Sequence, residues 1–159
     1  MMGKLTAGEA RLLDILQQDG RITNQELAER AGMSASPCWR RVQALQDRGV
    51  IRRHVTLLDP GKIGLQVIAW AAVQLQCYKE DEVRRFEESV AGVPEIVECY
   101  SVMGESEYVL KVVVPDPQAY DRFLHEFLFK VPGLVRVRSS LALREVKYTT
   151  VLPLQQALA

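Results

Sequence analysis

Five arginines between positions 34 and 53 are the side chains whose type and spacing most clearly suggest a chemistry. They are Arg40, Arg41, Arg48, Arg52 and Arg53. The same stretch holds one acidic residue, Asp47, so its local net charge is +4. Guanidinium groups bind phosphate oxygens through charge-assisted hydrogen bonds. The cluster therefore predicts contact with a polyanion such as a nucleic acid.

The charge of the whole chain is divided unevenly between its halves. The 159 residues hold 20 Lys+Arg and 20 Asp+Glu, so the formal net charge is zero. Residues 1–62 hold ten basic and seven acidic residues, whereas residues 63–159 hold ten and thirteen. This asymmetry indicates that one half faces a polyanion and the other does not.

Residue types suited to catalysis or metal binding are few and scattered. The two histidines, His54 and His125, lie in different halves and in no recognisable metal or nucleophile motif. Cys38, Cys77 and Cys99 form no CxxC pair, so we interpret them as reduced structural thiols, with redox sensing as the minor alternative. No glycine-rich phosphate loop is present. We predict a protein that is not an enzyme and holds no metal or other cofactor.

The apolar segments are too short to cross a membrane. The most apolar run, Val67–Val73, is bounded by glutamines, whereas a spanning helix needs about 20 apolar residues. The first residues lack the apolar core of a signal peptide. We expect a cytoplasmic protein with no membrane partner.

Two short helices are predicted at the N-terminus. Thr6–Glu9 and Thr23–Glu26 are capping boxes, in which the Thr hydroxyl and the Glu carboxylate satisfy free amides at a helix start. Gly20 and Gly32 are expected to end these helices in the left-handed conformation.

A third helix is predicted to carry the basic side chains. It should begin at the Ser36–Pro37 pair, as N-cap and first helical residue, and stop at Gly49. Its apolar residues recur on one face, which leaves Arg40 and Gln43 on the opposite face for solvent or a partner. Two short helices followed by such a helix are typical of a helix-turn-helix that docks in the major groove of DNA. A helical subdomain with a merely solvated polar face is the alternative.

The start of this third helix would approach base edges in such a complex. The candidates for reading bases are Ser34, Ala35, Ser36, Trp39, Arg40 and Gln43. Arg41, Arg52 and Arg53 are more typical of phosphate contacts. Packing of Trp39 against the first helix is an equally good interpretation. The β-prone residues 50–58 predict a wing and a linker.

The second half alternates β-prone and helical segments. Strands are expected over 66–77, 96–102, 108–114 and 135–143, and amphipathic helices over 80–90 and from Pro117 towards the turn at 131–133. This order is the ferredoxin-like βαββαβ plan, with both helices on one face of an antiparallel sheet. The other face is left bare, so we expect a second copy of the chain to cover it.

Several of these segments resemble the Lrp/AsnC family of feast/famine regulators. The resemblance rests on Asp19–Asn24, Ser34–Val42, Gly104–Tyr108 and Glu145–Tyr148. It implies an α+β chain with a winged helix-turn-helix over 1–53, a strand or linker over 54–65, and a βαββαβ oligomerisation and effector domain, the RAM domain, over 66–159. It also implies transcription regulation through double-stranded DNA, homodimers assembling into octamers, and amino-acid effectors. An architectural DNA-binding oligomer without an effector is the alternative.

The resemblance further implies an effector site between dimers, near one loop of the second domain. Its candidates are Gly104, Glu105, Glu107 and Tyr108, with Ser139 and Ser140 on the last strand. Backbone beside a glycine can approach a carboxylate, and an acidic side chain can hold an ammonium group. The family usually has an aspartate before this tyrosine, whereas Glu107 is one methylene longer. For the two serines, ordinary strand positions are an equally good interpretation.

Overall fold

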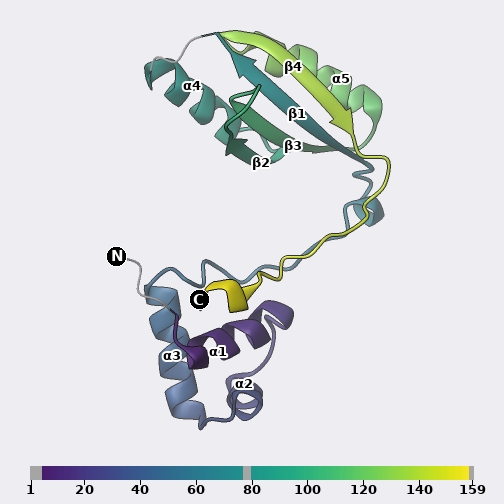
Figure 1. Ribbon diagram of the computed structural model, residues 1–159. Helices are drawn as coiled ribbons and strands as arrows, with labels where there is room; N and C mark the ends of the chain where they lie inside the picture. The colour runs from purple at the N-terminus through teal and green to yellow at the C-terminus, as the bar shows by residue number, and fades with distance from the viewer. Residues whose placement is uncertain (1–4, 77–79, 158–159) are drawn as a thin grey trace. The chain divides into compact units, whose positions relative to one another are not determined.

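The computed structural model describes residues 5–76 and 80–157, which form two compact units (Figure 1). Among these residues, the first unit contains positions up to Leu57 together with those from Lys147 onwards, and the second contains Leu58–Val146. The described segment from Lys147 thus groups with the N-terminal helices, whereas the predicted second domain, 66–159, included it. Within the described ranges, no helix combines the length and apolarity that crossing a membrane requires.

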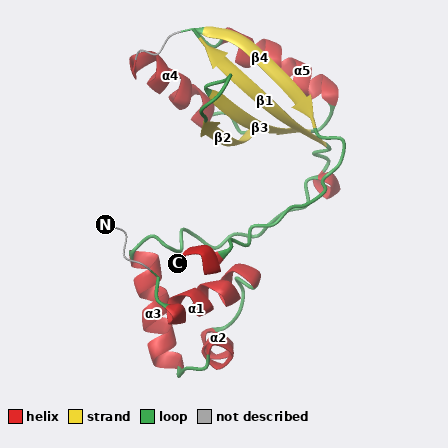
Figure 2. Ribbon diagram, in the orientation of Figure 1, coloured by secondary structure: helices red, strands yellow, loops and turns green. Residues whose placement is uncertain are grey.

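The first unit consists mainly of three helices, α1 (Ala7–Gln18), α2 (Asn24–Ala31) and α3 (Ala35–Asp47) (Figure 2). Both predicted capping boxes are present, at Thr6 with Glu9 and at Thr23 with Glu26. Gly32 ends α2 in the left-handed conformation, as predicted. The helices meet around a small apolar core made of Leu12, Leu27, Ala28, Ala31 and Cys38. A 3-10 turn, Leu154–Ala157, completes the unit.

Two helix boundaries differ from the predictions. α1 ends at Gln18, its C-cap is Asp19 in an extended conformation, and Gly20 has no positive φ. The Asp19 carboxylate accepts a hydrogen bond from the amide of Arg21 at 3.0 Å, so a local side-chain turn replaces the glycine cap. α3 begins two residues earlier than predicted, with Ser34 at the N-cap. Pro37 is tolerated in its first turn because those amides have no helical acceptor.

Residues 50–58, predicted as a wing and a linker, form no strand, and the chain from 52 to 59 is irregular. Just before this irregular stretch, the amides of Val50 and Ile51 donate to the Leu45 carbonyl at 2.9 and 3.2 Å, which turns the chain away from α3. A β-prone segment becomes a strand only where another strand supplies its hydrogen bonds. The described residues offer this segment no such partner.

The second unit has the predicted βαββαβ order. Its elements are β1 (Val67–Leu75), α4 (Glu80–Ala91), β2 (Ile96–Ser101), β3 (Tyr108–Val114), α5 (Pro117–Glu126) and β4 (Leu134–Leu141), with 3-10 turns at Gly61–Ile63 and Leu128–Lys130. The strands pair antiparallel in the order β2-β3-β1-β4. Both helices lie on the same side of the sheet (Figure 1). Cys77, expected at the end of the first strand, lies outside the described residues.

Alternation along the two central strands separates a covered sheet face from a bare one. The residues that face the helices are buried: Ala69, Ala71, Val73 and Leu75 on β1, and Tyr108, Leu110, Val112 and Val114 on β3. Their neighbours face the other way. On that side Trp70 is 39% exposed and Tyr100 57% exposed. One protomer therefore leaves a sheet face with large aromatic side chains uncovered.

Candidate DNA-binding and effector sites

Side-chain hydrogen bonds to backbone carbonyls fix how α1, α2 and α3 lie against one another. Asn24, the first residue of α2, donates through Nδ2 to the carbonyl of Ala35 at 3.0 Å and so ties α2 to the start of α3. Arg11 on α1 donates through Nη2 to the carbonyl of Arg30 at 3.2 Å. The start of α3 is thus held by backbone contacts that do not depend on its own exposed side chains.

The other end of α3 is held by Glu9. Its carboxylate accepts hydrogen bonds from the Thr6 amide at 2.7 Å and the Thr6 hydroxyl at 2.9 Å, and it forms an ion pair with Arg48. The hydrogen bond from the Thr6 backbone, helped by the Thr6 hydroxyl and Arg48, holds the pKa of Glu9 below its usual value. Arg48 therefore ties α3 to α1, which distinguishes it from the other arginines of the basic cluster.

The residues predicted to read bases lie at and near the start of α3, and most are exposed. Trp39 is 56% exposed and lies outside the core of the unit, so it does not pack into that core against α1. Arg40 is exposed, and the side chain of Ser34 makes no capping hydrogen bond. Gln43 is half-buried and donates to Gln46 at 2.8 Å, so its amide already has a partner. Ala35 and Ser36 are exposed as well.

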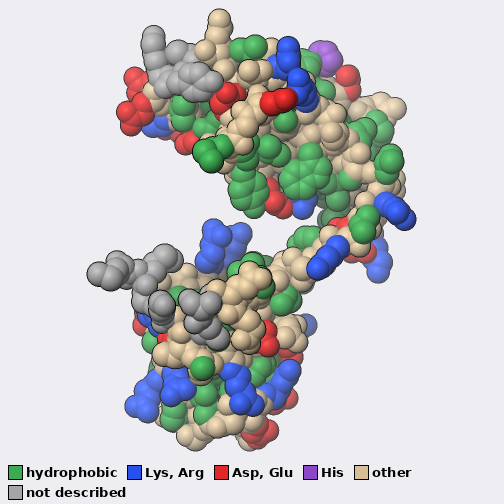
Figure 3. All heavy atoms as spheres, in the orientation of Figure 1, with side chains coloured by type: hydrophobic (Ala, Val, Ile, Leu, Met, Phe, Trp, Pro, Cys, Tyr) green, Lys and Arg blue, Asp and Glu red, His purple; other side chains and the backbone are tan. Residues whose placement is uncertain are grey.

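The three residues predicted to contact phosphate are also exposed. Arg52 and Arg53 lie on the segment that leaves α3. Arg41 lies against α1, because a Cβ added at Gly8 would stand 3.1 Å from its Nη1 atom. Figure 3 shows Lys and Arg side chains distributed over the visible face of the N-terminal unit. The apolar face of α3 points inward, since Cys38 and Leu45 are both fully buried.

The described cysteines carry no sign of activation. Cys38 is buried and Cys99 exposed, and neither forms a disulfide. Desolvation raises the pKa of both thiols, and Glu87 raises that of Cys99 further. Over residues 5–76 and 80–157, no three His, Cys, Asp or Glu side chains gather as a metal site would require.

The loop between β2 and β3 brings the predicted effector residues together. Gly104 has φ 153°, a conformation that residues with a side chain rarely adopt, and no atom lies near the position of an added Cβ. The Glu107 amide donates to the Val73 carbonyl at 3.0 Å, and its carboxylate accepts from the Leu75 amide at 3.0 Å. Glu107 thereby anchors the loop to the end of β1.

Tyr108 points away from this loop, into the core under the helices. It is 4% exposed, its ring lies 4.5 Å from that of Phe86, and its hydroxyl donates to Glu87 at 2.8 Å. Burial, with the hydrogen bond to Glu87, raises the pKa of Tyr108 to about 12. Sequence reasoning missed Glu87, because nothing along the chain links a polar position on α4 to a strand residue.

The two candidate serines lie on opposite faces of the sheet. Ser139 faces the helices, where its hydroxyl lies 2.7 Å from that of Tyr120. Ser140 lies opposite Trp70 across the strand pair, on the bare face. Arg138, which sequence reasoning did not propose, forms an ion pair with Glu105 at 2.5 Å. The alternation of residues along the last strand places Arg138 on the outward face, and this pattern could have indicated it in the sequence.

The bare face itself combines aromatic and charged groups. The ammonium group of Lys111 lies 5.7 Å from the centre of the Trp70 ring and 2.9 Å from the Glu98 carboxylate. Tyr100 lies opposite Val109 on the neighbouring strand. Hydrophobic side chains gather over this unit in Figure 3. An exposed apolar patch rimmed by charge is typical of a protein interface.

Comparison with known proteins identifies both units. Residues 10–52 match the winged helix-turn-helix DNA-binding family, and residues 68–152 match the Lrp/AsnC ligand binding domain. A DNA-binding helix-turn-helix joined to a ligand-binding domain defines a class of transcriptional regulator. The chain belongs to the Lrp/AsnC family of DNA-binding transcriptional regulators.

Individual relatives match along nearly the whole chain. The chain is 38% identical over 147 residues to the DNA-binding transcriptional activator DecR of Escherichia coli K12, covering 92% of this chain and 97% of DecR. It is 36% identical over 139 residues to the leucine-responsive regulatory protein of the same strain, covering 87% and 85%. The structure of a Neisseria meningitidis transcriptional regulator in complex with L-Met has a TM-score of 0.91 and 36% identity, covering 96% and 98%.

Proposed function

We propose that this regulator binds specific DNA sites as a symmetric homodimer and changes its binding or assembly when an amino acid binds at the β2–β3 loop. The observation that carries the amino-acid part is its similarity, along 96% of the chain, to a regulator whose structure contains L-Met. We place the site of action in the cytoplasm.

The proposed dimer forms through the bare sheet face. Trp70 and Tyr100 lie there, and burying side chains of this size contributes about 1.5–3 kcal/mol each. A second copy of the chain has the same uncovered sheet face, so each copy can cover the other. Such a contact is self-complementary and closes with two-fold symmetry. We further propose that dimers assemble into an octamer, with effector loops at the contacts between them.

The proposed DNA contacts divide into two groups. The first residues of α3 with Trp39, Arg40 and Gln43 read bases, while Arg41, Arg52 and Arg53 bind phosphates. In a dimer, two such helices read half-sites related by the same two-fold axis. The residues proposed to read bases at the helix start are Ser34, Ala35 and Ser36.

The proposed effector site uses the loop backbone at Gly104 for the carboxylate and loop carboxylates for the ammonium group. Glu105 is the better placed of the two acids, because its side chain is 82% exposed, whereas the Glu107 carboxylate accepts a hydrogen bond from the Leu75 amide. Ser140 contributes to the surroundings of this site from the last strand. Tyr108 contributes through its position next to Glu107 in the chain. Ser139, bonded to Tyr120, contributes from the covered side only.

One observation favours an alternative, an architectural DNA-binding oligomer without an effector. The carboxylates of both loop acids are engaged within the protomer, Glu107 with Leu75 and Glu105 with Arg138. An amino acid must therefore compete with contacts already made.

Enrichment of genomic fragments, with and without an amino-acid mixture, tests the proposal. At about 150 mM salt, where nonspecific binding is weak, we expect a two-fold symmetric site whose enrichment changes with the mixture. In parallel, an amino acid at about one hundred times its Kd should stabilise the protein by about 2.7 kcal/mol. Enrichment with no response to any amino acid would favour the architectural alternative, and no enrichment in either condition would contradict sequence-specific binding.

A further inference from the structure

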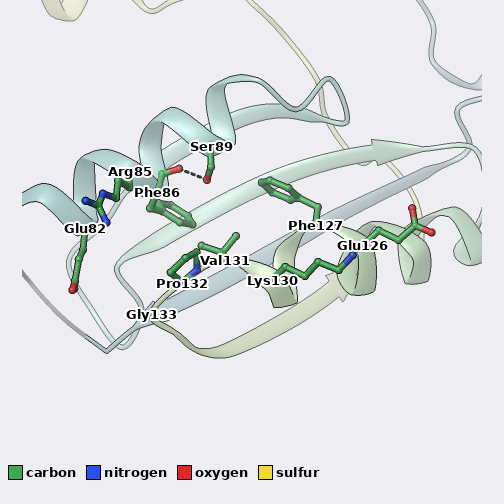
Figure 4. Close-up of a pocket in the computed structure, with 10 residues that line it drawn as sticks. All are labelled: Glu82, Arg85, Phe86, Ser89, Glu126, Phe127, Lys130, Val131, Pro132 and Gly133. Carbon is green, nitrogen blue, oxygen red and sulfur yellow. Dashed lines mark hydrogen bonds between the residues drawn. The ribbon is translucent and has the colours of Figure 1, made fainter.

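A pocket of about 290 Å³ lies on the helical side of the second unit, between α4 and the chain that follows α5 (Figure 4). Small-molecule pockets span about 300–1,000 Å³, so its size suits a small metabolite. It is built within one protomer and shares no lining residue with the β2–β3 loop. It is therefore separate from the effector site proposed above.

The middle of the pocket is apolar. Phe86 of α4 and Phe127 at the end of α5 approach it from either side, with Val131 between them (Figure 4). Phe86 is 2% exposed and Val131 8% exposed, so both belong to the core and hold the pocket in shape. Ser89 also lines it, but its hydroxyl donates to the Phe86 carbonyl at 2.7 Å.

Two cations line opposite sides of the pocket, Arg85 on α4 and Lys130 on the turn after α5 (Figure 4). Within the described residues, neither has a carboxylate oxygen within 4.0 Å. Arg84, the neighbour of Arg85, behaves differently, because it pairs with Asp81 at 3.2 Å and with Glu88 at 4.0 Å.

Two acids also line the pocket, but among the described residues neither forms an ion pair with Arg85 or Lys130. The carboxylates of Glu82 and Glu126 point outward, away from the two phenyl rings (Figure 4). An apolar centre flanked by two cations that form no ion pair within the described part of the chain is complementary to a ligand with an apolar body and a negative end.

We propose that this pocket binds a small metabolite that carries a carboxylate on a compact branched or aromatic apolar group. The apolar group lies between Phe86 and Phe127, and Arg85 or Lys130 holds the carboxylate. Recognition requires no ammonium group, which distinguishes this ligand class from the amino acids proposed for the β2–β3 loop. The proposals for the two sites can therefore be tested independently of each other.

A matched pair of probes tests this ligand class on the full chain. 4-Methylpentanoate and 3-methylbutylamine share one apolar group and differ in the sign of the charged end. By isothermal titration we expect the carboxylate to bind once per protomer and the amine not to bind. In amide NMR spectra the shifts should centre on Phe86, Ser89 and Gly133, away from the β2–β3 loop.

Variants then assign the contacts. The double change Arg85→Gln with Lys130→Gln should weaken binding by about tenfold or more, as the loss of charge-assisted hydrogen bonds implies. Ser89→Phe should block binding while keeping both cations. Arg84→Gln is the matched control on the same helix and should bind normally. Because these side chains are exposed, circular dichroism should report an intact fold.

Three results would overturn the proposal. They are equal binding of the amine, unchanged affinity in the double variant, and the absence of carboxylate binding up to millimolar concentration. Shifts centred on the β2–β3 loop would also reject this pocket as the site. The first three results would bear neither on DNA binding nor on an amino-acid effector, whereas shifts at the loop would point to the effector site proposed above.

Discussion

Gln17 on α1 and Leu152 of the C-terminal segment exchange two hydrogen bonds. The Leu152 amide donates to Oε1 of Gln17 at 2.8 Å, and Nε2 of Gln17 donates to the Leu152 carbonyl at 3.1 Å. One side-chain amide thus satisfies both backbone groups of a residue, as a neighbouring strand would. Both residues belong to the first unit, because the described chain from Lys147 onwards groups with the N-terminal helices.

Replacing Gln17 should release this C-terminal segment without unfolding the helices. In Gln17→Ala both hydrogen bonds are lost, and each contributes about 0.5–1.5 kcal/mol. We expect the Leu152 amide to exchange with solvent about tenfold faster or more. Hydrogen exchange read by mass spectrometry measures this directly. Gln18→Ala, a change at the exposed neighbouring glutamine, should leave the segment protected. Equal exchange in the two variants would show that the segment is held by other contacts.

Arg40→Ala should weaken binding to the specific site and relax its sequence preference. Arg40 is exposed near the start of α3, and a bidentate contact between an arginine and a base is worth about 1–3 kcal/mol. Affinities for the specific site and for single-base variants of it, measured by fluorescence anisotropy, test this. A uniform loss across all sequences would assign Arg40 to phosphate instead.

Arg52→Ala should instead weaken binding to all sequences alike. Loss of one phosphate contact lowers the slope of log affinity against log salt by about 1. A salt titration of specific and random DNA measures that slope. Arg48→Ala is the contrasting variant, because Arg48 pairs with Glu9. Its main effect should be on the stability of the N-terminal unit, and an Arg52 effect confined to one sequence would contradict the phosphate role.

Trp70→Glu should dissociate the dimer while leaving the protomer folded. The change replaces an exposed aromatic ring by a carboxylate that a dimer would have to bury. We expect dimerisation to weaken by about a hundredfold or more, because the hydrophobic contribution of about 1.5–3 kcal/mol is replaced by a desolvation cost. Analytical ultracentrifugation measures this. Phe129→Glu is the control, since Phe129 is exposed beside α5, where its ring contacts that of His125. If Phe129→Glu dissociated the dimer and Trp70→Glu did not, the bare sheet face would not be the interface.

The raised pKa of Tyr108 predicts that the folded protein loses stability at alkaline pH. Its pKa rises from 10.0 to about 12 in the folded chain, so folding favours the neutral phenol. This contribution is complete below pH 10 and is lost as the pH rises towards 12. Urea unfolding across this range should show the loss in the parent protein and a smaller one in Tyr108→Phe. Glu87→Gln, which removes the hydrogen-bonded carboxylate, should lower the pKa of Tyr108. An alkaline profile identical in all three proteins would contradict this account.

Local patterns in the sequence predicted most of the elements correctly. Capping boxes such as that of Thr23 and Glu26, and strand alternation such as that after Tyr108, are decided by residues a few positions apart. The two shifted helix ends show the limit of such patterns. At the end of α1, the Asp19 side chain accepts a hydrogen bond from the Arg21 amide in place of a glycine cap. At the start of α3, the helix begins after Ser34 instead of after Ser36.

The sequence by itself determined the two kinds of unit, the order of their elements and the basic cluster near α3, because each follows from periodicity, capping and charge along the chain. Only the tertiary structure decided which polar groups meet. Glu9 with Arg48, Tyr108 with Glu87, Glu105 with Arg138 and Gln17 with Leu152 are pairs brought together by packing. Their partners lie 39, 21, 33 and 135 residues apart, and no local rule links positions at such separations.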